Sequence, residues 1–348
     1  MTRLFVPMTK ATGFGPLPDV LEKHAGSKAL PRAFQLAGLP MDIIEFPEFW
    51  LPVASMHALF EISAREAGDR CFGLSVGQDM SHASFGLWIK YCAQAGTLAD
   101  GLNRVISCAP FQQTGCRMIL ETSVPISFWR YVAPKELAGS IQHCDHLIVP
   151  MIHFVQSYLG PEWQPEWVDL NYPRDDLSHQ LESQLPFPVR YGASSLTLAI
   201  KADDLFRSKL TRVSARQSIT FADVQAAEAS GPSKEPLKSV YSAITLRLLD
   251  GHTDIQGAAC VLGIGVQPLQ RNLRREGVNY RALLDIAKLN RAQALLADTG
   301  LPVTEIALAL GYNSLGNFSR AFKRLVGLAP MTYRGLHLAT SLDQTPAD

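Results

Sequence analysis

A short stretch near the carboxyl end of the chain combines cationic and amide side chains in a spacing that could recognise paired bases. In GYNSLGNFSRAFKR, residues 311–324, Asn317, Arg320 and Arg324 recur at i, i+3 and i+7, which places them on one face of a helix. From the major groove, arginine can bond both acceptors of guanine, and asparagine can bond adenine. Lys323 and Arg324 would add contacts to phosphates, which fix the position of the helix without reading sequence.

The opposite face of the same segment is apolar. Its apolar positions recur at i, i+3, i+4 and i+7, and they are occupied by Phe318, Ala321, Phe322 and Leu325. This spacing predicts a helix that is packed onto its own domain by that face. An ordinary surface helix with a solvated basic face would have the same two faces, so one copy of the pattern leaves both interpretations open.

An earlier stretch repeats the arrangement. Residues 261–277, VLGIGVQPLQRNLRREG, and residues 309–327 each have Leu-Gly, a short turn and a helix with an apolar pair four residues apart. The offset is 48 residues at Leu-Gly and 49 in the helix, so the later copy has one extra turn residue. In the first copy, the residues expected to contact DNA are Gln267, Gln270 and Arg271, which would read bases, and Arg274 and Arg275, nearer the backbone. Two matching copies favour two helix-turn-helix units over a solvated basic helix.

The segment between the two copies has the length of a spacer. NYRALLDIAKLNRAQALLADTG predicts a helix of about six turns, with Leu289, Ala292 and Leu296 on one stripe and Gly300 as its stop. A helix of ~20 residues spans ~30 Å, close to the ~34 Å between successive major-groove segments. One chain could therefore read two such segments without dimerising.

The helices before the two reading helices have their own start signals. In TDIQGAACVLG, Thr253 and Gln256 form a capping-box pattern. In LPVTEIALALG, Pro302 stands near the first helical position, where its missing N–H costs nothing. All segments after residue 236 are therefore predicted to be helical.

The part of the chain before this region mixes both kinds of element. Apolar periodicity predicts helices at 56–68, 97–109 and 141–160, the last despite Pro150. Runs of β-branched and aromatic residues predict two strands around Pro125 within residues 116–133, and another strand at 191–200. The predicted fold class is therefore α+β, with a mixed α/β N-terminal domain followed by an all-α domain of two helix-turn-helix units joined by a long helix.

Gly231, Pro232 and Pro236 interrupt any helix and mark the boundary. The predicted organisation is a mixed α/β domain at 1–230, a linker at 231–236, the tandem helix-turn-helix domain at 237–338, and a disordered tail at 339–348. The formal net charge of zero hides −4 for residues 1–233 and +6 for residues 234–338. A basic module joined to a mildly acidic one indicates a polyanionic partner for the basic module alone.

Composition favours a soluble globular protein of the cytoplasm. Hydrophobic residues make up 47% of the 348 residues, and charged residues make up 18%. The six cysteines form no CxxC pair, which is typical of reduced thiols. We expect neither a signal peptide nor a membrane span, since no apolar run is long enough for either.

Two further motifs could support other chemistry. GLSVG, residues 73–77, matches the nucleophile elbow of hydrolases and would make Ser75 a nucleophile, but a predicted helix precedes it where a strand is required. A structural turn is the other interpretation of these residues.

His143 and His146 fall on one helix face, with His153 further along, so a metal-responsive regulator is an alternative. A pocket for a planar or apolar effector and simple core filling are both open for Trp88, Trp129, Trp163 and Trp167.

The C-terminal hundred residues resemble the AraC/XylS family of bacterial transcription regulators. The likeness is strongest in VTEIALALGYNSLGNFSRAFKRLVGLAPMTYR, residues 303–334, and extends to the first unit. It implies base-facing positions at Gln267, Gln270, Arg271, Asn317 and Arg320. Gly265 and Gly316 stand where the family often has Ser, Gln267 where it often has Arg, and Lys288 where Arg is usual. Glycine is an acceptable N-cap, so these departures bear on the DNA sequence that is read, and not on the fold.

Residues 20–210 resemble the sensor domain of a subgroup of this family that includes ornithine-utilisation regulators. Most of the likeness lies in AGDRCFGLSVGQDMSHASFGLWIKYCAQAGTLADGLNRV, residues 67–105. The two resemblances together imply a regulator, not an enzyme, that binds double-stranded DNA and an unidentified small-molecule effector. They also imply that the domain at 1–230 senses the effector and could form a homodimer, that RNA polymerase is a partner, and that no cofactor is bound. Activator is the role expected from the family, although the residues themselves leave activator and repressor open.

Overall fold

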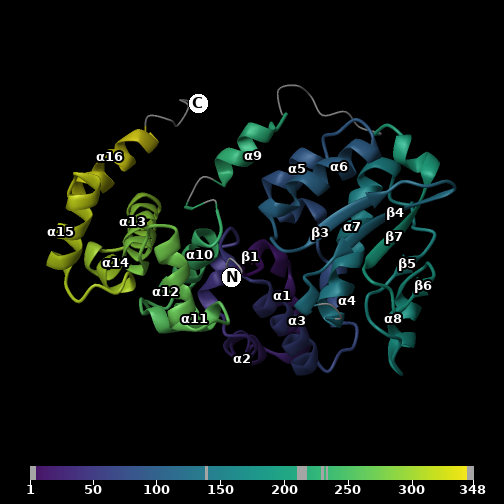
Figure 1. Cartoon of the computed structure of the whole chain (residues 1–348), viewed down its shortest axis with the longest axis horizontal. Coiled ribbons are helices and arrows are strands. Elements are labelled where there is room, and N and C mark those ends of the chain that lie inside the picture. Colours follow the sequence, from purple (N-terminus) through teal and green to yellow (C-terminus); the bar gives the residue numbers. More distant parts are fainter. Residues whose placement is uncertain (1–4, 138–139, 210–217, 229–230, 233, 343–348) are drawn as a thin grey trace. The chain divides into compact units, whose positions relative to one another are not determined.

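The computed structural model describes residues 5–137, 140–209, 218–228, 231–232 and 234–342, and it divides the chain into two compact units. The first comprises Pro7–Ala229, and the second comprises Ser230–Asp348 together with Met1–Val6; they are called the N-terminal unit and the C-terminal unit below (Figure 1). Within the described residues, every strand lies in the N-terminal unit, and the C-terminal unit is helical. This confirms the predicted α+β fold class.

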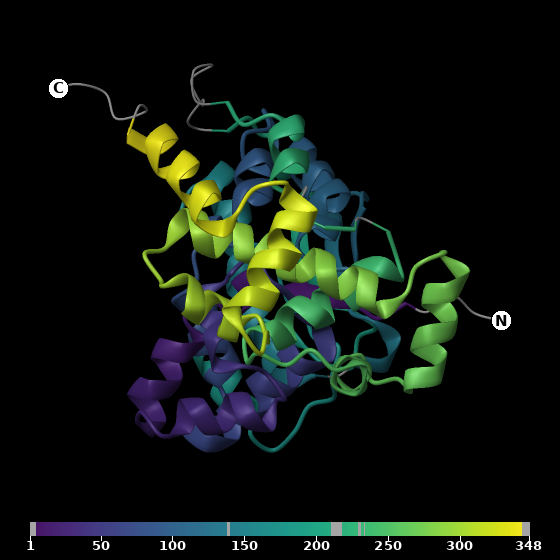
Figure 2. The same ribbon diagram turned by 90° about the vertical axis from the view of Figure 1, so that its left-hand side faces the viewer.

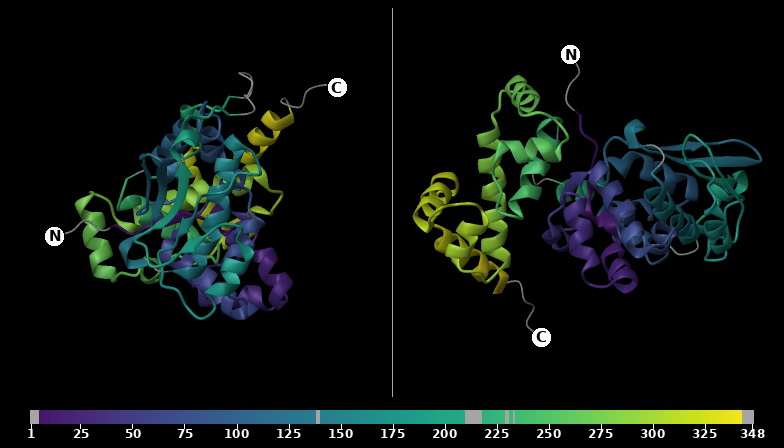
Figure 3. Two further views of the ribbon diagram at one scale, coloured as in Figure 1. Left: turned by 90° about the vertical axis from the view of Figure 1, so that its right-hand side faces the viewer. Right: turned by 90° about the horizontal axis from the view of Figure 1, so that it is seen from below.

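The N-terminal unit contains a five-stranded sheet in the order β3-β4-β7-β5-β6 (Figure 3, left panel). The strands are β3 (Arg117–Glu121), β4 (Ile126–Val132), β5 (Val168–Asp169), β6 (Val189–Arg190) and β7 (Leu196–Lys201). All neighbours are antiparallel except β5 and β6. The predicted strands around Pro125 and near residue 200 are confirmed as β3, β4 and β7. The central strand β7 is buried on both faces from Leu196 to Ile200, and all of these residues except Thr197 are apolar.

Helices surround this sheet and a two-stranded antiparallel sheet of β1 (Met8–Lys10) and β2 (Trp50–Pro52). They are α1 (Leu17–Ala25), α2 (Ala29–Leu36), α3 (Val53–Ala67), α4 (Phe72–Gln78), α5 (Leu87–Cys92), α6 (Leu98–Cys108), α7 (Ile141–Leu159), α8 (Ser178–Gln184) and α9 (Phe221–Ala227). Short 3₁₀ turns occupy Ala11–Phe14, Met41–Glu45, His82–Phe85, Ala109–Phe111, Lys135–Leu137 and Ala202–Phe206. Of the helices in the described ranges, none is both long and apolar enough to cross a membrane.

Helix α7 is the centre of the N-terminal unit. It packs against α3, α4 and β7, and most of its side chains are buried, including the polar side chains of Gln142, His143, Asp145 and His146. On β4, alternate residues face inward, and Trp129 contacts Phe154 of α7 with ring centroids 5.8 Å apart. The predicted helix at 141–160 is confirmed, and it continues through Pro150.

The C-terminal unit is a series of seven helices in its described residues (Figure 2). They are α10 (Leu237–Leu248), α11 (Ile255–Val261), α12 (Val266–Arg275), α13 (Tyr280–Asp298), α14 (Val303–Ala309), α15 (Leu315–Val326) and α16 (Pro330–Leu342). Helix α10 contacts α11 and α13, whereas α16 contacts α13 and α15. Helix α13 thus belongs to two small helical groups, which are visible in the right panel of Figure 3.

The predicted duplication is present in the two turns. Gly263 after α11 and Gly311 after α14 both adopt left-handed backbone, with φ of 65° and 69°. The same pair of hydrogen bonds closes each helix: Gly263 N to Cys260 O and Ile264 N to Ala259 O, and Gly311 N to Leu308 O and Tyr312 N to Ala307 O. This is the Schellman arrangement, which strongly favours glycine because its left-handed residue is strained with a side chain. The next helix then starts after one more residue in the second copy, as the sequence predicts.

Three local expectations are wrong. Helix α11 is capped by Asp254, whose carboxylate accepts the Gly257 N–H, and not by Thr253. Asp254 also pairs with Arg247, which favours a carboxylate at the cap over a hydroxyl. Helix α13 ends at Asp298 with an extended Thr299, so Gly300 is not its stop. The expected tail from residue 339 is helical as far as Leu342, and residues 343–348 lie outside the described part.

Candidate DNA-binding surface

Helix α15 has two faces of opposite character. Its apolar face buries Phe318 and Phe322, which are 1% and 2% exposed, in a core formed with α13 and α14. Asn317 and Arg320 are exposed on another face, where the Arg320 Nη2 donates to the Asn317 Oδ1 at 2.7 Å. This bond holds the guanidinium and the amide together in the free protein. A side-by-side guanidinium and amide can meet the edges of neighbouring base pairs.

Two more cationic residues lie near the carboxyl end of α15. Lys323 and Arg324 are both exposed in its last full turn. The segment has no acidic residue, so the positive charge of its polar face is not neutralised within the helix. Ser314 caps the helix by accepting the Asn317 N–H at 3.2 Å. The predicted packing role of Leu325 is wrong, because its side chain is 45% exposed. Gly316 lies inside the helix, so it is not the N-cap.

Helix α12 repeats these features in the first copy. Leu269 and Leu273 are buried, and Gln267 and Arg271 are exposed on its polar side. Gln270 is only half-buried, so part of its amide remains accessible. The exposed cations at its carboxyl end are Arg274 and Arg275. Gly265 is the N-cap and offers no side-chain bond, which is the one clear local difference from α15.

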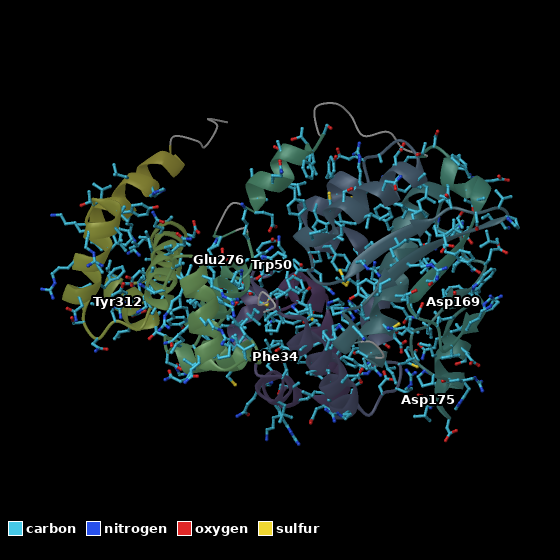
Figure 4. All side chains as sticks on the ribbon, viewed as in Figure 1. Phe34, Trp50, Asp169, Asp175, Glu276 and Tyr312 are labelled. Atoms are coloured by element: carbon cyan, nitrogen blue, oxygen red, sulfur yellow. The ribbon has the colours of Figure 1, made fainter. Side chains whose placement is uncertain are left out.

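Two residues near these helices were not predicted to be structural. Asn272 of α12 is 7% exposed, and its Nδ2 donates to the Pro268 carbonyl at 2.9 Å. Lys288 of α13 is 8% exposed, and its ammonium lies 4.3 Å from the ring centroid of Tyr312 (labelled in Figure 4). A cation over an aromatic face is attracted by the ring electrons, so Lys288 links α13 to the turn before α15. Burial lowers the pKa of Lys288.

The GLSVG motif is part of helix α4, so the structural turn that was its other interpretation is wrong. The Ser75 hydroxyl donates to the Cys71 carbonyl one turn earlier, at 3.3 Å. A Cβ on Gly73 or Gly77 would come within 2.1 Å or 2.5 Å of a backbone oxygen of α7. The two glycines therefore let α4 and α7 pack closely, which accounts for the motif without hydrolase chemistry.

The histidines of α7 form an aromatic stack with His57 of α3. The rings of His57 and His143 lie 3.9 Å apart, and those of His143 and His146 lie 5.2 Å apart. His153 lies elsewhere, with its Nδ1 hydrogen-bonded to the Met80 carbonyl at 3.3 Å. In the part of the chain that the structure describes, no group of three or more His, Cys, Asp or Glu side chains is placed to hold a metal ion.

The tryptophans divide between the two interpretations. Trp88 and Trp129 line a cavity in the N-terminal unit together with His143 and His146. Trp163 and Trp167 do not line it; the Trp163 indole donates to Asp204 at 3.0 Å. Sequence could single out the aromatic and imidazole residues. It could not show that the helices and the strand that carry Trp88, Trp129 and His146 line the same cavity.

Two known domains match the chain. The arabinose-binding N-terminal domain of AraC transcription regulators matches residues 29–208, and a helix-turn-helix domain matches residues 258–335. The second match contains both α12 and α15 and the whole of α13. Each of the two units therefore has a counterpart of its own.

Individual relatives agree with these matches. An uncharacterized HTH-type transcriptional regulator of Mycobacterium tuberculosis is 41% identical over 337 residues, which covers 90% of this chain and 94% of that protein. The ornithine utilization regulator of Pseudomonas aeruginosa is 40% identical over 81 residues, covering 23% of this chain and 24% of that protein. The crystal structure of the transcriptional regulator CdpR from Pseudomonas aeruginosa covers 88% of this chain and 97% of its own at 20% identity, with a TM-score of 0.39.

Proposed function

Because the chain belongs to the AraC family of transcription regulators, we propose that α12 and α15 are its two recognition helices. The protein is a DNA-binding regulator with an N-terminal ligand-binding domain, and it is not an enzyme. The open questions are which residues read DNA and how the ligand controls them. The observation that supports the assignment is the repeated division of each helix into a buried apolar pair and an exposed polar face without acidic residues.

Base reading is assigned to the middle of each exposed face. Arg271 in α12 and Arg320 in α15 would each bond guanine O6 and N7, and Asn317 would bond adenine N6 and N7. Gln267 and Gln270 would read adenine in the first segment in the same way. The remaining exposed cations of the two helices, which would contact phosphates, are Arg274, Arg275, Lys323 and Arg324.

Helix α13 sets the spacing between the two readers. Its 19 residues correspond to about 28 Å of helix. Adding the ends of the recognition helices brings the reading residues near the ~34 Å repeat of successive major-groove segments. A single chain would then contact both segments on one side of the duplex.

Control by the effector is assigned to residues 1–230, with residues 231–236 as the linker. Lys10 of β1 is buried and pairs with Glu48 at 2.6 Å and also with Glu228, at the end of α9 and just before the linker. Ligand binding near β1 could therefore change how α9 is held. A ligand shifts such an equilibrium only by its difference in affinity for the two arrangements.

Three wider assignments rest on the family alone. We propose that the protein acts in the cytoplasm, that it contacts RNA polymerase as an activator, and that the N-terminal unit can form a homodimer. Chromatography with light scattering tests the last assignment, and transcription from a bound promoter tests the second. A monomer at all concentrations, or repression of that promoter, would contradict them.

Selection of bound fragments from random duplex DNA tests the central proposal. The expected result is a site with two short conserved segments about one helical turn apart. Arg271→Ala should relax the preference in one segment, and Arg320→Ala should relax it in the other. A site with one segment, or variants that both act on the same segment, would contradict the two-reader proposal.

A further inference from the structure

The N-terminal unit contains a cavity of about 100 Å³ between the sheet and the helices. Its wall includes Trp129 and Tyr131 of β4, Trp88 of α5, and His143 and His146 of α7. This volume is of the same order as the ~150 Å³ cavity that takes up benzene in another protein. The space therefore suits one ring with a small substituent, and is too small for a fused polycyclic molecule.

The described lining residues contain no Asp, Glu, Lys or Arg. The only titratable nitrogens in the wall belong to His143 and His146, which are 4% and 1% exposed. Burial lowers the pKa of His146 to about 4 and that of His143 well below the ordinary value, with His57 stacked beside them at a pKa of about 4. At neutral pH the three imidazoles are uncharged, and no wall residue provides a counter-ion for a charged ligand.

The wall nevertheless contains polar groups without partners. The indole N–H groups of Trp88 and Trp129 are buried and make no hydrogen bond, although these residues are only 7% and 2% exposed. Buried tryptophan N–H groups usually have an acceptor. His146 donates its Nδ1–H to the His143 carbonyl at 3.1 Å, so in the neutral ring the Nε2 is an acceptor, and it has no partner. Residues of the wall thus hold two unpartnered donors and one unpartnered acceptor, whereas the other polar side chains of the mostly apolar wall, those of Thr9, Gln112, Gln113 and Tyr131, are hydrogen-bonded within the protein.

We propose that this cavity binds an uncharged, ring-sized aromatic molecule that has one hydrogen-bond acceptor and one donor. The acceptor would receive the Trp88 or Trp129 N–H, and the donor would bond to the His146 Nε2. This inference rests on the proposed role of the N-terminal unit in effector control, and it narrows the class of effector. It also runs against a sugar, despite the arabinose-binding description of the matching domain.

Two ligand classes fit this wall poorly. A pentose has several hydroxyl groups, and most of them would lose hydration without gaining partners, which is unfavourable in a buried site. A free amino acid such as ornithine would place an ammonium and a carboxylate beside neutral groups only. An unpaired buried charge is strongly disfavoured. Neutral aromatics avoid both costs.

Benzamide and benzoate form a matched pair of probes, since they have the same shape and differ in charge. Each would be added to the full-length protein at pH 7 and followed by the change in Tm and by calorimetric titration, with L-arabinose and L-ornithine as comparisons. The expected result is saturable binding of benzamide and at least about tenfold weaker binding of the other three. Benzoate and ornithine would bury a charge without a partner, and arabinose would bury hydroxyl groups without partners. Equal binding of benzoate, or no saturable binding of benzamide, would overturn the proposal.

Trp88→Phe tests the donor, with Trp163→Phe as the control outside the cavity. Trp88→Phe should weaken benzamide binding about fivefold to tenfold, the loss typical of one hydrogen bond, and Trp163→Phe should leave it unchanged. If both Trp88→Phe and Trp129→Phe bind benzamide as the unmodified protein does, the assigned contacts are wrong. Should either variant fail to fold, the benzamide and benzoate comparison on the unmodified protein decides alone. Binding of benzamide without any change in operator affinity would count against its role as an effector analogue, but not against the DNA-reading proposal.

Discussion

Arg320 and Lys323 lie three residues apart on α15, both exposed, and the proposal gives them different tasks. Arg320 is held by Asn317 at 2.7 Å and is assigned to a base, whereas Lys323 is assigned to a phosphate. Arg320→Ala should weaken binding to the selected site by ~1–3 kcal/mol, or roughly 5-fold to 150-fold. It should barely change binding to unrelated DNA. Lys323→Ala should weaken binding to both kinds of DNA by the same factor.

The salt dependence gives a second magnitude. The four residues assigned to phosphates are Arg274, Arg275, Lys323 and Arg324. At ~0.9 per phosphate contact, four contacts give a slope of about −3.6 for the logarithm of affinity against the logarithm of salt. Between 50 and 200 mM salt, affinity should then fall about 150-fold. Removing one phosphate contact should make the slope less steep, about −2.7, and affinity should then fall only about 40-fold over the same range of salt.

Fluorescence anisotropy with a labelled duplex measures both effects. Affinities would be determined at four salt concentrations for the selected site and for a scrambled duplex of equal length. Arg320→Lys keeps the charge but loses the two-pronged bond, so it should behave like Arg320→Ala in specificity and like the unmodified protein in salt slope. Lys323→Arg should resemble the unmodified protein in both. If Arg320→Ala lowers affinity equally on both duplexes and flattens the slope, Arg320 contacts phosphate only, and the base-reading assignment is refuted.

Three further predictions concern stability, each measured as the free energy of unfolding of the full chain in urea. Gly263→Ala should lower the free energy of unfolding by about 1 kcal/mol, because alanine is strained in the left-handed backbone of this residue. Gly311→Ala should lower it by about 2 kcal/mol or more, because the added Cβ would also lie 3.0 Å from the backbone oxygen of Gly251, whereas a Cβ at residue 263 meets nothing. Equal losses for the two variants would contradict this packing. Asp254→Ala should cost about 1 kcal/mol through loss of the α11 cap, and Thr253→Ala less than about 0.5 kcal/mol; the reverse order would restore the capping box expected from sequence. Burial, and to a lesser degree His146, lower the pKa of His57 from 6.5 to about 4, so stability should be full above pH 6.5 and fall by about 1.4 kcal/mol per pH unit between 6.5 and 4 for this group. His57→Phe should remove that share of the slope, and an unchanged slope would mean that His57 is already protonated or exposed in the folded state.

The sequence predicted the C-terminal unit well because its signals are local. Leu-Gly pairs, apolar pairs four residues apart and cap residues each act within one or two turns, and they are repeated. The error at the start of α11 has a different origin: the spacing of Thr253 and Gln256 matches a capping box, but Asp254 is the cap and its partner, Arg247, lies in the preceding helix. The sequence around a helix start does not show which of two neighbouring candidate cap residues has a charged partner in another helix.

The N-terminal unit was predicted only at the level of its elements. Its strands and helices follow from apolar periodicity, but the order β3-β4-β7-β5-β6 is set by contacts between distant segments. The role of Gly73 and Gly77 depends on the backbone of α7, about seventy residues later. From the sequence, the interpretations of the motif were therefore a structural turn and, less well matched, a catalytic serine. The cavity could not be foreseen for the same reason. Trp88, Trp129 and His146 acquire a common function only when α5, β4 and α7 come together.

The two proposed recognition helices have unlike residues at the proposed reading positions, and this bears on the form of the operator. One helix presents Gln267, Gln270 and Arg271, and the other presents Asn317 and Arg320. Identical helices related by a two-fold axis read palindromic sites, because both half-sites meet the same side chains. Unlike helices joined in tandem within one chain read two different segments in a fixed order. The site for one chain should therefore be asymmetric, and a homodimer should bind two copies of that composite site, whose relative direction would report how the protomers are paired.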